Sequence, residues 1–218
     1  MHLPFTTAQF FDVIRHYNEA VWPVQVVLTV LGLAAVGLVV SGQAWAARAI
    51  CALLALLWAW SGFAYQLAFF SAINPAAYGF AVIFGLGAAA FLMRAIAIGD
   101  LRFRAGRNAT TALGLALVVY GFVIYPVWST VAGHAYPSLP TFGLPCPTTI
   151  VTVGLLTLAR GTRRWLLLVA PMLWALVGTQ AAFLLGVLPD LGLGVAGGVA
   201  AVIALRERAP RTGHAVAH

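Results

Sequence analysis

The chain has 218 residues, of which 62% are hydrophobic and 8% are charged, and its mean hydropathy is +0.97. Soluble domains typically contain about 45–50% apolar and about 25% charged residues, so a water-soluble fold that buries this much apolar surface is excluded. The net charge of +7 comes from 12 basic residues, all arginine, against 5 acidic ones, and because the arginines stand in short clusters between apolar runs, membrane orientation explains them better than nucleic-acid binding.

The first predicted element is an amphipathic helix within residues 1–20. Apolar residues recur at helical spacing from Phe10 to Tyr17, charged residues occupy the other face, and Thr6 and Gln9 have the spacing of a capping box. This pattern predicts an interfacial helix on the outer membrane surface. An ordinary extramembrane helix packed on the loops is the alternative.

The uncharged runs that follow predict a single all-α transmembrane domain over residues 21–205. A charge at the bilayer centre costs at least about 2.5–3.5 kcal/mol, and a span needs about 20 apolar residues. Seven spans are predicted: 21–40, two within 49–93 separated by a turn at 71–75, 108–132, a short one between Pro147 and Arg160, 165–185, and one from Pro189-Asp190 to about 205. The polar residues 206–218 are predicted to be a disordered cytoplasmic tail.

The arginines predict the orientation of the bundle. Alternate loops place Arg15 on one side and all the others on the opposite side, namely Arg48, Arg94, Arg102, Arg104, Arg107, Arg160, Arg163, Arg164, Arg206, Arg208 and Arg211. Basic residues in short loops are retained in the cytoplasm, so the N-terminus is predicted outside and the C-terminus inside.

The Pro- and Gly-rich segment 133–147 is the most informative part of the sequence for function. If Pro147 begins the fifth spanning helix and Arg160 marks its cytoplasmic end, that helix is only about 20 Å long, against a hydrocarbon core of about 30 Å. The loop before it is therefore predicted to dip into the membrane beside an outward-facing cavity, because irregular backbone at that depth must be shielded or line a cavity. The helix N-terminus at its floor would favour an anion or a thiolate.

Cys146, at the predicted N-cap of this helix, is the leading candidate ligand-binding residue. It could be a metal ligand or a nucleophile, and the alternative is that it packs as a small apolar residue. His134 could join it as a second metal ligand or as a base. The other candidate contacts are Tyr136, Asn74, Tyr65, Gln66, Gln180, Asp190 and His16. Aromatic-belt, helix-pairing and N-cap roles are the alternatives for the tyrosines, the glutamines and Asp190.

Several motifs resemble those of a family of bacterial multi-pass membrane proteins of unknown function. They are Tyr17-Asn18 through Trp22-Pro23, Phe69-Phe70 through Asn74-Pro75-Ala76-Ala77, Gly133–Pro137, Pro140–Gly143, Pro145–Thr149 and Leu173-Trp174 through Asp190–Gly192. The resemblance implies a multi-pass topology in the bacterial inner membrane and brings no activity. Where relatives often have a histidine after the tyrosine, this chain has Gln66, which weakens a histidine-based metal site.

Three functions fit these observations. The favoured one is binding or transport of a small solute or soft metal ion through the outward cavity. A membrane enzyme with Cys146 as nucleophile and His134 as base is the second, and an accessory subunit without a ligand is the third. The absence of lysine excludes a retinal photoreceptor, and the spans show no carboxylate suited to an ion relay. The sequence identifies no cofactor.

Overall fold

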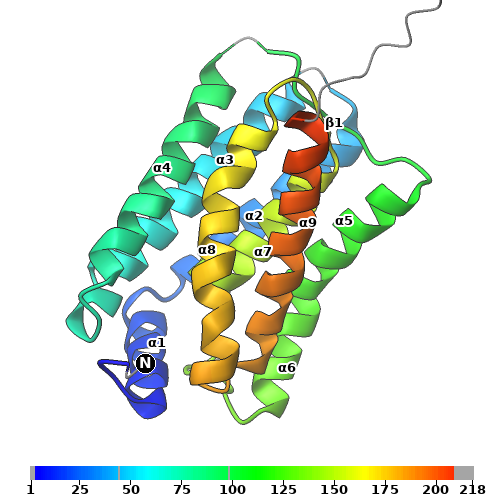
Figure 1. Ribbon diagram of the computed structural model, residues 1–218. Coiled ribbons are helices and arrows are strands. Elements are labelled where there is room, and N and C mark those ends of the chain that lie inside the picture. Colours follow the sequence, from blue (N-terminus) through cyan, green and yellow to red (C-terminus); the bar gives the residue numbers. More distant parts are fainter. Residues whose placement is uncertain (1–2, 44, 98, 209–218) are drawn as a thin grey trace, which may run out of the picture.

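The computed structural model describes residues 3–43, 45–97 and 99–208, and these form a bundle that is almost entirely helical (Figure 1). The α-helices are α1 (Thr7–Ala20), α2 (Val24–Ser41), α3 (Ala46–Trp60), α4 (Ala77–Ile96), α5 (Ala109–Val119), α6 (Tyr125–Val131), α7 (Pro145–Thr157), α8 (Trp165–Leu184) and α9 (Leu191–Arg208). Within the described residues, six helical stretches are long and apolar enough to cross a membrane, and α7 is a shorter apolar helix.

Two of the long stretches contain wide helical turns. The π-helix η1 (Ser61–Leu67) continues α3, and the π-helix η3 (Tyr120–Ile124) joins α5 to α6. Pro126 follows η3 and has no N–H to donate to the preceding turn, which accounts for a local departure from α-helical bonding there. Such π-turns are frequent at functional sites, and both of these carry or adjoin residues that line the cavity described below.

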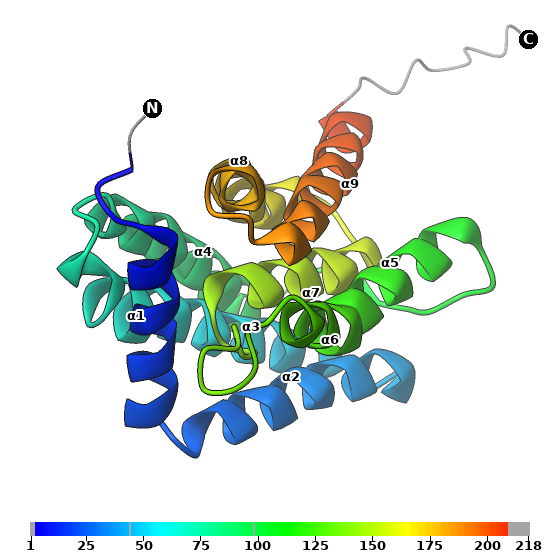
Figure 2. The ribbon, with the colours of Figure 1, turned by 90° about the horizontal axis from the view of Figure 1, so that it is seen from below.

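The short helix α7 forms the centre of the bundle. Twelve of its 13 residues are buried, and Figure 2 shows it between α2, α3, α5, α8 and α9. The close approach of α7 to α5 depends on two glycines. A Cβ on Gly154 would lie 2.8 Å from the carbonyl oxygen of Gly114 on α5, and a Cβ on Gly114 would lie 2.8 Å from the carbonyl oxygen of Gly154. The sequence placed the start of this helix at Pro147. The structure starts it at Pro145 with Leu144 as N-cap, because proline is compatible with the first helical turn.

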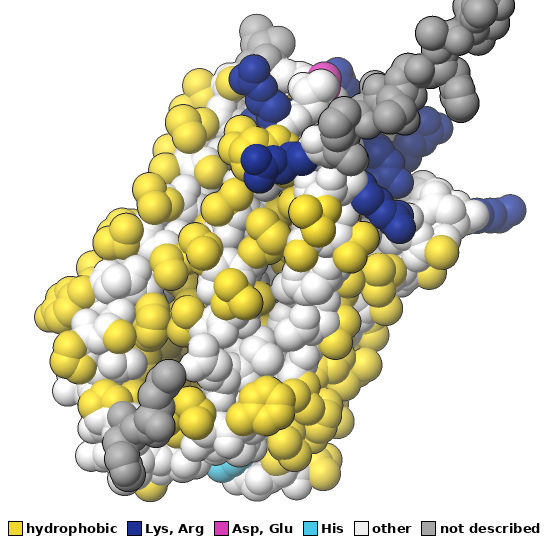
Figure 3. Space-filling view, viewed as in Figure 1, with side chains coloured by type: hydrophobic (Ala, Val, Ile, Leu, Met, Phe, Trp, Pro, Cys, Tyr) yellow, Lys and Arg dark blue, Asp and Glu magenta, His cyan; other side chains and the backbone are white. Residues whose placement is uncertain are grey.

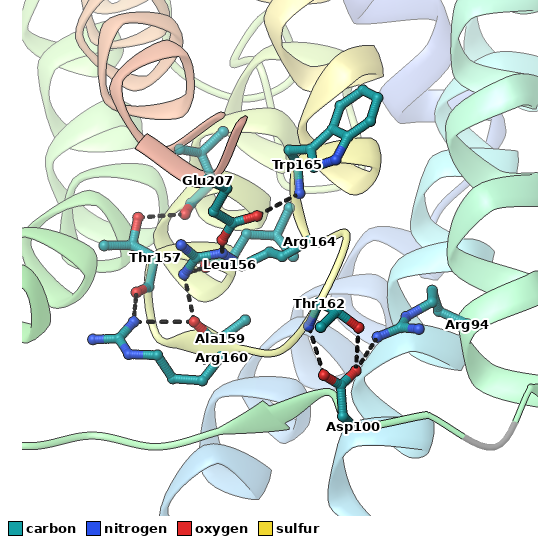
Figure 4. A network of polar contacts seen from close by, with 11 residues as sticks. Arg94, Asp100, Leu156, Thr157, Ala159, Arg160, Thr162, Arg164, Trp165 and Glu207 are labelled. Carbon is teal, nitrogen blue, oxygen red and sulfur yellow. Dashed lines mark hydrogen bonds and ion pairs between the residues drawn. The ribbon is translucent and has the colours of Figure 1, made fainter. Parts of the chain in front are cut away.

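Most of the arginines gather at one end of the bundle. Figure 3 shows them at the upper end, above sides that are largely apolar. Here β1 (Arg102–Phe103) pairs with β2 (Ala159–Arg160), and the carboxylate of Asp100 accepts hydrogen bonds from the backbone and side chain of Thr162 (Figure 4). These bonds lower the pKa of Asp100.

An ion pair at the same end joins the start of α8 to α9. The guanidinium of Arg164 lies 2.5 Å from a carboxylate oxygen of Glu207, whose other oxygen accepts from the backbone N–H of Trp165 at 3.0 Å (Figure 4). Residues 206–208, where the sequence predicts the start of the cytoplasmic tail, belong to α9. Residues 209–218 lie outside the described residues.

Helix α1 lies at the opposite end of the bundle (Figures 1 and 2). The predicted capping box is present, with Thr6 and Gln9 each bonding the other's backbone. Its buried face includes Tyr17, whose hydroxyl accepts a hydrogen bond from the indole N–H of Trp60 at 2.7 Å. Desolvation raises the pKa of Tyr17 to about 12. The helix is thus fixed to the bundle through a buried polar contact as well as through apolar packing.

Asn18 connects α1 to the Pro-rich loop. Its side-chain amide donates to the carbonyl oxygens of Pro137 and Leu139 at 2.6 and 2.7 Å, and its side-chain oxygen accepts from the hydroxyl of Thr141 at 2.8 Å. The side-chain amide of Gln25 donates to the backbone oxygen of Asn18 at 2.6 Å. Because Asn18 has no exposed surface, these bonds are shielded from water and hold the loop against α1.

Candidate functional site

A cavity of about 300 Å³ lies at the end of the bundle where α1 packs. Its wall is formed by α1, η1, the start of α4, α6, the loop before α7 and the second half of α8. The start of α7 and the short 3₁₀ turn η4 (Leu188–Asp190) contribute residues as well. The volume is at the lower end of the range of about 300–1,000 Å³ for small-molecule pockets.

An aspartate forms part of the cavity lining. The hydroxyl of Tyr125 donates to Oδ1 of Asp190 at 2.6 Å. The other carboxylate oxygen, Oδ2, is buried and has no hydrogen-bond partner among the described residues. Cys146, at the second position of α7, lies next to this carboxyl group. A buried carboxylate oxygen without a donor is costly, and a bound ligand could supply that donor.

Two further polar groups facing the cavity lack partners. The side chain of Gln66 in η1 has no exposed surface, and neither its oxygen nor its nitrogen is hydrogen-bonded in the described part of the chain. The indole N–H of Trp174 on α8 is also buried and unpaired there. Buried polar groups in folded proteins are nearly always hydrogen-bonded, so three such residues at one cavity indicate a place where polar atoms of a ligand or solvent are bound.

The rest of the lining is largely apolar and aromatic. The aromatic members are Phe5, Phe10, Tyr65, Phe70, Phe80, Tyr125 and Trp174. Several of their rings contact one another, since Tyr65 stacks on Phe70 at 5.8 Å between centroids and Phe80 meets Trp174 edge to face at 5.4 Å. Such contacts fix the ring positions and give the cavity a defined shape.

The rim of the cavity lies on α8 and on the segment before α1. Gln180 and Leu184 line the cavity and are exposed, whereas the polar residues Gln66 and Asp190 are buried. Leu3, Pro4 and Phe5 complete the rim, and the ring of Phe5 packs against Phe70. The cavity thus has an accessible side and a closed polar side.

Six of the nine predicted contacts line this cavity: Cys146, Asn74, Tyr65, Gln66, Gln180 and Asp190. The side chain of Asn74 also accepts a hydrogen bond from the backbone of Ala76 and thereby caps the turn before α4. The structure therefore brings together polar residues from segments that are far apart in the sequence.

The other three predicted contacts lie outside the lining. His134 stacks on Phe11 with ring centroids 3.4 Å apart, and its partial burial lowers its pKa. His16 lies on the exposed face of α1 beside Asp12. Tyr136 is half exposed, and its hydroxyl lies 3.4 Å from the backbone oxygen of Asn18. His134 is consequently placed to pack α1 against the loop, on a different surface from Cys146.

The described residues contain no group of three or more His, Cys, Asp or Glu side chains that could hold a metal ion. Both cysteines are free, with Cys51 fully buried in the core. The arrangement around Cys146 offers one thiol and one carboxylate, together with hydroxyl and amide groups. This set suits hydrogen bonding to an organic molecule better than it suits a soft metal ion.

Trp174 is a cavity residue that the sequence does not predict, and Tyr125 is one for which an aromatic-belt role is the favoured prediction over ligand contact. Tyr125 has the sequence position of an interfacial aromatic residue, and Trp174 stands in an apolar run without any polar neighbour. The only signal for Trp174 is its presence in one of the motifs quoted above. The contact of Tyr125 with Asp190 and the place of Trp174 in the lining depend on the packing of α6 and α8, which local sequence patterns do not contain.

Comparison with known proteins places the chain in a family while leaving the activity open. A model of a family of unknown function, DUF6064, matches residues 7–214. No curated protein and no solved structure matches the chain. The match covers the long apolar helices and every described cavity residue from α1 onward, and the chain therefore belongs to the DUF6064 family.

Proposed function

We propose that this membrane protein binds a small molecule with an apolar body and a polar head in the cavity between α1, α4 and α8. The single observation that carries the proposal is that unpaired buried polar atoms of Gln66, Trp174 and Asp190 meet at one otherwise apolar cavity. The aromatic walls suit the body of the ligand, and the polar atoms suit its head. Binding of this kind is the step that a receptor and a transporter share.

We also propose that the cavity faces the outside of a bacterial inner membrane, with the N-terminus outside, the C-terminus cytoplasmic and α7 as a seventh, short span. The support is the position of the described arginines, which lie at the end opposite to the cavity apart from Arg15 on α1 (Figure 3). Helix α7 has 13 residues, about 20 Å, and it is enclosed by the longer helices. Its end at the cavity therefore lies below the level that a full span would reach.

The alternative of a cysteine enzyme receives less support from the geometry. A nucleophilic thiol needs a base within about 3 Å or through one water molecule. His134, the expected base, stacks on Phe11 and is absent from the cavity lining. We therefore favour binding over catalysis.

A bulky substitution in the cavity tests the proposed function. Val177→Trp adds a large side chain to the lining, whereas Leu176→Trp places the same side chain on the exposed side of the same helix. 4-Phenylbutan-1-ol, a neutral probe with an aromatic body and a hydroxyl head, should raise the Tm of the purified wild-type protein and of Leu176→Trp. It should leave the Tm of Val177→Trp unchanged, because the added indole occupies the cavity. Equal shifts in all three proteins would place the probe elsewhere and contradict the proposal.

A further inference from the structure

Among the described residues, the cavity is lined by one acidic side chain that can carry a full charge and by no basic one. Asp190 is the single Asp, Glu, Lys, Arg or His residue among the described residues that line it. Its Oδ1 is held by the hydroxyl of Tyr125, while Oδ2 is left without a donor. When it is ionised, a carboxylate with a free acceptor atom in an apolar cavity attracts a cation more strongly than it would in water, because the effective dielectric constant is lower. The cation in turn stabilises the ionised form of the carboxyl group.

The aromatic lining adds a second preference for positive charge. Ring faces carry negative electrostatic potential, and cations bind over Trp, Tyr and Phe within about 6 Å of the ring centroid. Trp174 and Tyr125 belong to the lining together with Asp190 itself. Combined carboxylate and aromatic groups are the chemistry that recognises ammonium ions.

The helix N-termini at the cavity do not reverse this preference. The sequence suggested that the start of α7 would favour an anionic ligand, and α9 begins at Leu191, directly after Asp190. The carboxylate of Asp190 therefore already stands at the positive end of α9, where it is stabilised. An anionic ligand would be brought close to this carboxylate, and like charges at short range repel.

We infer that the ligand of the cavity is an organic cation, with a protonated nitrogen on an apolar or aromatic body, and that Asp190 is its counter-charge. The amide oxygen of Gln66, which has no partner in the described chain, is a second acceptor for a protonated nitrogen. This inference rests on the proposed function and names the charge of its ligand.

Cys146 provides a direct measurement of the charge preference, because it is partly accessible, lines the cavity and lies beside Asp190. In a Cys51→Ala protein, Cys146 is the remaining thiol. It is modified separately with three methanethiosulfonates that react with a thiol in the same way. They are the cationic 2-(trimethylammonio)ethyl, the anionic 2-sulfonatoethyl and the neutral methyl reagent. Each rate is divided by the rate of the same reagent with 2-mercaptoethanol. The normalised rate of the cationic reagent should be about ten or more times that of the anionic reagent, and this quotient is the cation-to-anion ratio.

Variants of Asp190 identify the origin of that ratio. Asp190→Asn should bring it close to unity, and Asp190→Glu should retain it. Because both rates in the ratio report the same thiol, a change in thiol reactivity cancels. If Asp190→Asn does not fold, Gln66→Glu supplies an independent reading, since an added carboxylate should raise the ratio above the wild-type value.

The outcomes separate the inference from the proposed function. A wild-type ratio near unity, with Cys146 readily modified by the neutral reagent, would overturn the cation inference and leave the binding cavity intact. A high ratio that survives Asp190→Asn would also overturn it, because the selectivity would then come from other groups. If even the neutral reagent fails to modify Cys146 and 4-phenylbutan-1-ol also leaves the Tm of the wild-type protein unchanged, the cavity is closed, and the proposed function falls with the inference.

Discussion

Asn18 is the residue that fixes the position of the Pro-rich loop. Its buried side chain satisfies two backbone carbonyl groups and one hydroxyl group that belong to this loop. The loop leads into Leu144 and Cys146, which line the cavity. Asn18 therefore influences the cavity without lining it, because it holds the loop that positions Leu144 and Cys146.

Removal of this side chain should loosen the loop. Asn18→Ala leaves the carbonyl groups of Pro137 and Leu139 without a donor, and an unsatisfied buried group costs about 1–3 kcal/mol. We expect a lower Tm in detergent and faster modification of Cys146. The neighbouring Glu19→Ala, on the exposed face of α1, is the control and should change either quantity little. An unchanged Tm in Asn18→Ala would show that the loop is held by other contacts.

At the scale of single residues, the sequence indicates which side chains could form a site better than it indicates which side chains they contact. The sequence predicts Cys146, Gln66 and Asp190 as contacts because each is a polar side chain in an apolar region, and the structure places all three in the lining of one cavity. His134 is equally prominent in the sequence, yet it stacks on Phe11. The difference arises from the direction in which each side chain points, and this direction is set by packing between elements.

The glycines of α2 illustrate how one helix is fitted to its neighbours. A Cβ on Gly32 would lie 2.5 Å from the ring of Phe142 and 2.8 Å from that of Phe122, whereas a Cβ on Gly37 would meet nothing within 4 Å. The two positions belong to the same helix and differ only in what they face. They therefore form a matched pair for testing the contact between α2 and the Pro-rich loop.

Gly32→Ala should destabilise the protein and Gly37→Ala should not. The added methyl group at residue 32 forces two aromatic rings to move, and overpacking of this kind typically costs about 1–3 kcal/mol. At residue 37 the same change lowers the flexibility of the unfolded chain and should leave the Tm equal or slightly higher. Thermal unfolding of the two variants side by side makes the comparison, and equal Tm values would contradict the close packing of α2 on Phe142.

The helices themselves are largely predictable from the sequence, and their irregularities are not. Uncharged runs and the turn at 71–75 give the long helices to within a few residues, because charge exclusion and backbone hydrogen bonding act locally. The π-helices η1 and η3 were not predicted. Their extra residue per turn has no distinct sequence signature beyond Pro126, although η1 is what carries Tyr65 and Gln66 at the cavity.

The whole molecule has two chemically different ends, and this difference predicts its orientation. Arginines occupy one end, and the cavity and the Pro-rich loop occupy the other (Figure 3). Exposed positions exist at both ends, Ala105 in the loop after α4 and Ala135 in the loop after α6. They allow each end to be labelled separately.

An impermeant maleimide should label Ala135→Cys and spare Ala105→Cys in intact spheroplasts, both in a Cys51→Ala, Cys146→Ala background. Arginine-bearing loops are retained in the cytoplasm, so Ala105→Cys should react only after the membrane is permeabilised. Labelling of Ala105→Cys in intact spheroplasts, with Ala135→Cys protected, would reverse the proposed topology.

The shortness of α7 has an electrical consequence. If the cavity faces the outside as proposed and holds water, the insulating layer is thinner there than across the neighbouring helices, and the transmembrane voltage falls over a reduced path between Cys146 and the far end of α7. An elementary charge that crosses a full potential of 100 mV gains or loses about 2.3 kcal/mol. A cationic occupant beside Asp190 would therefore stand at the start of that potential drop, and a negative interior would draw it toward the far end of the helix over this short path.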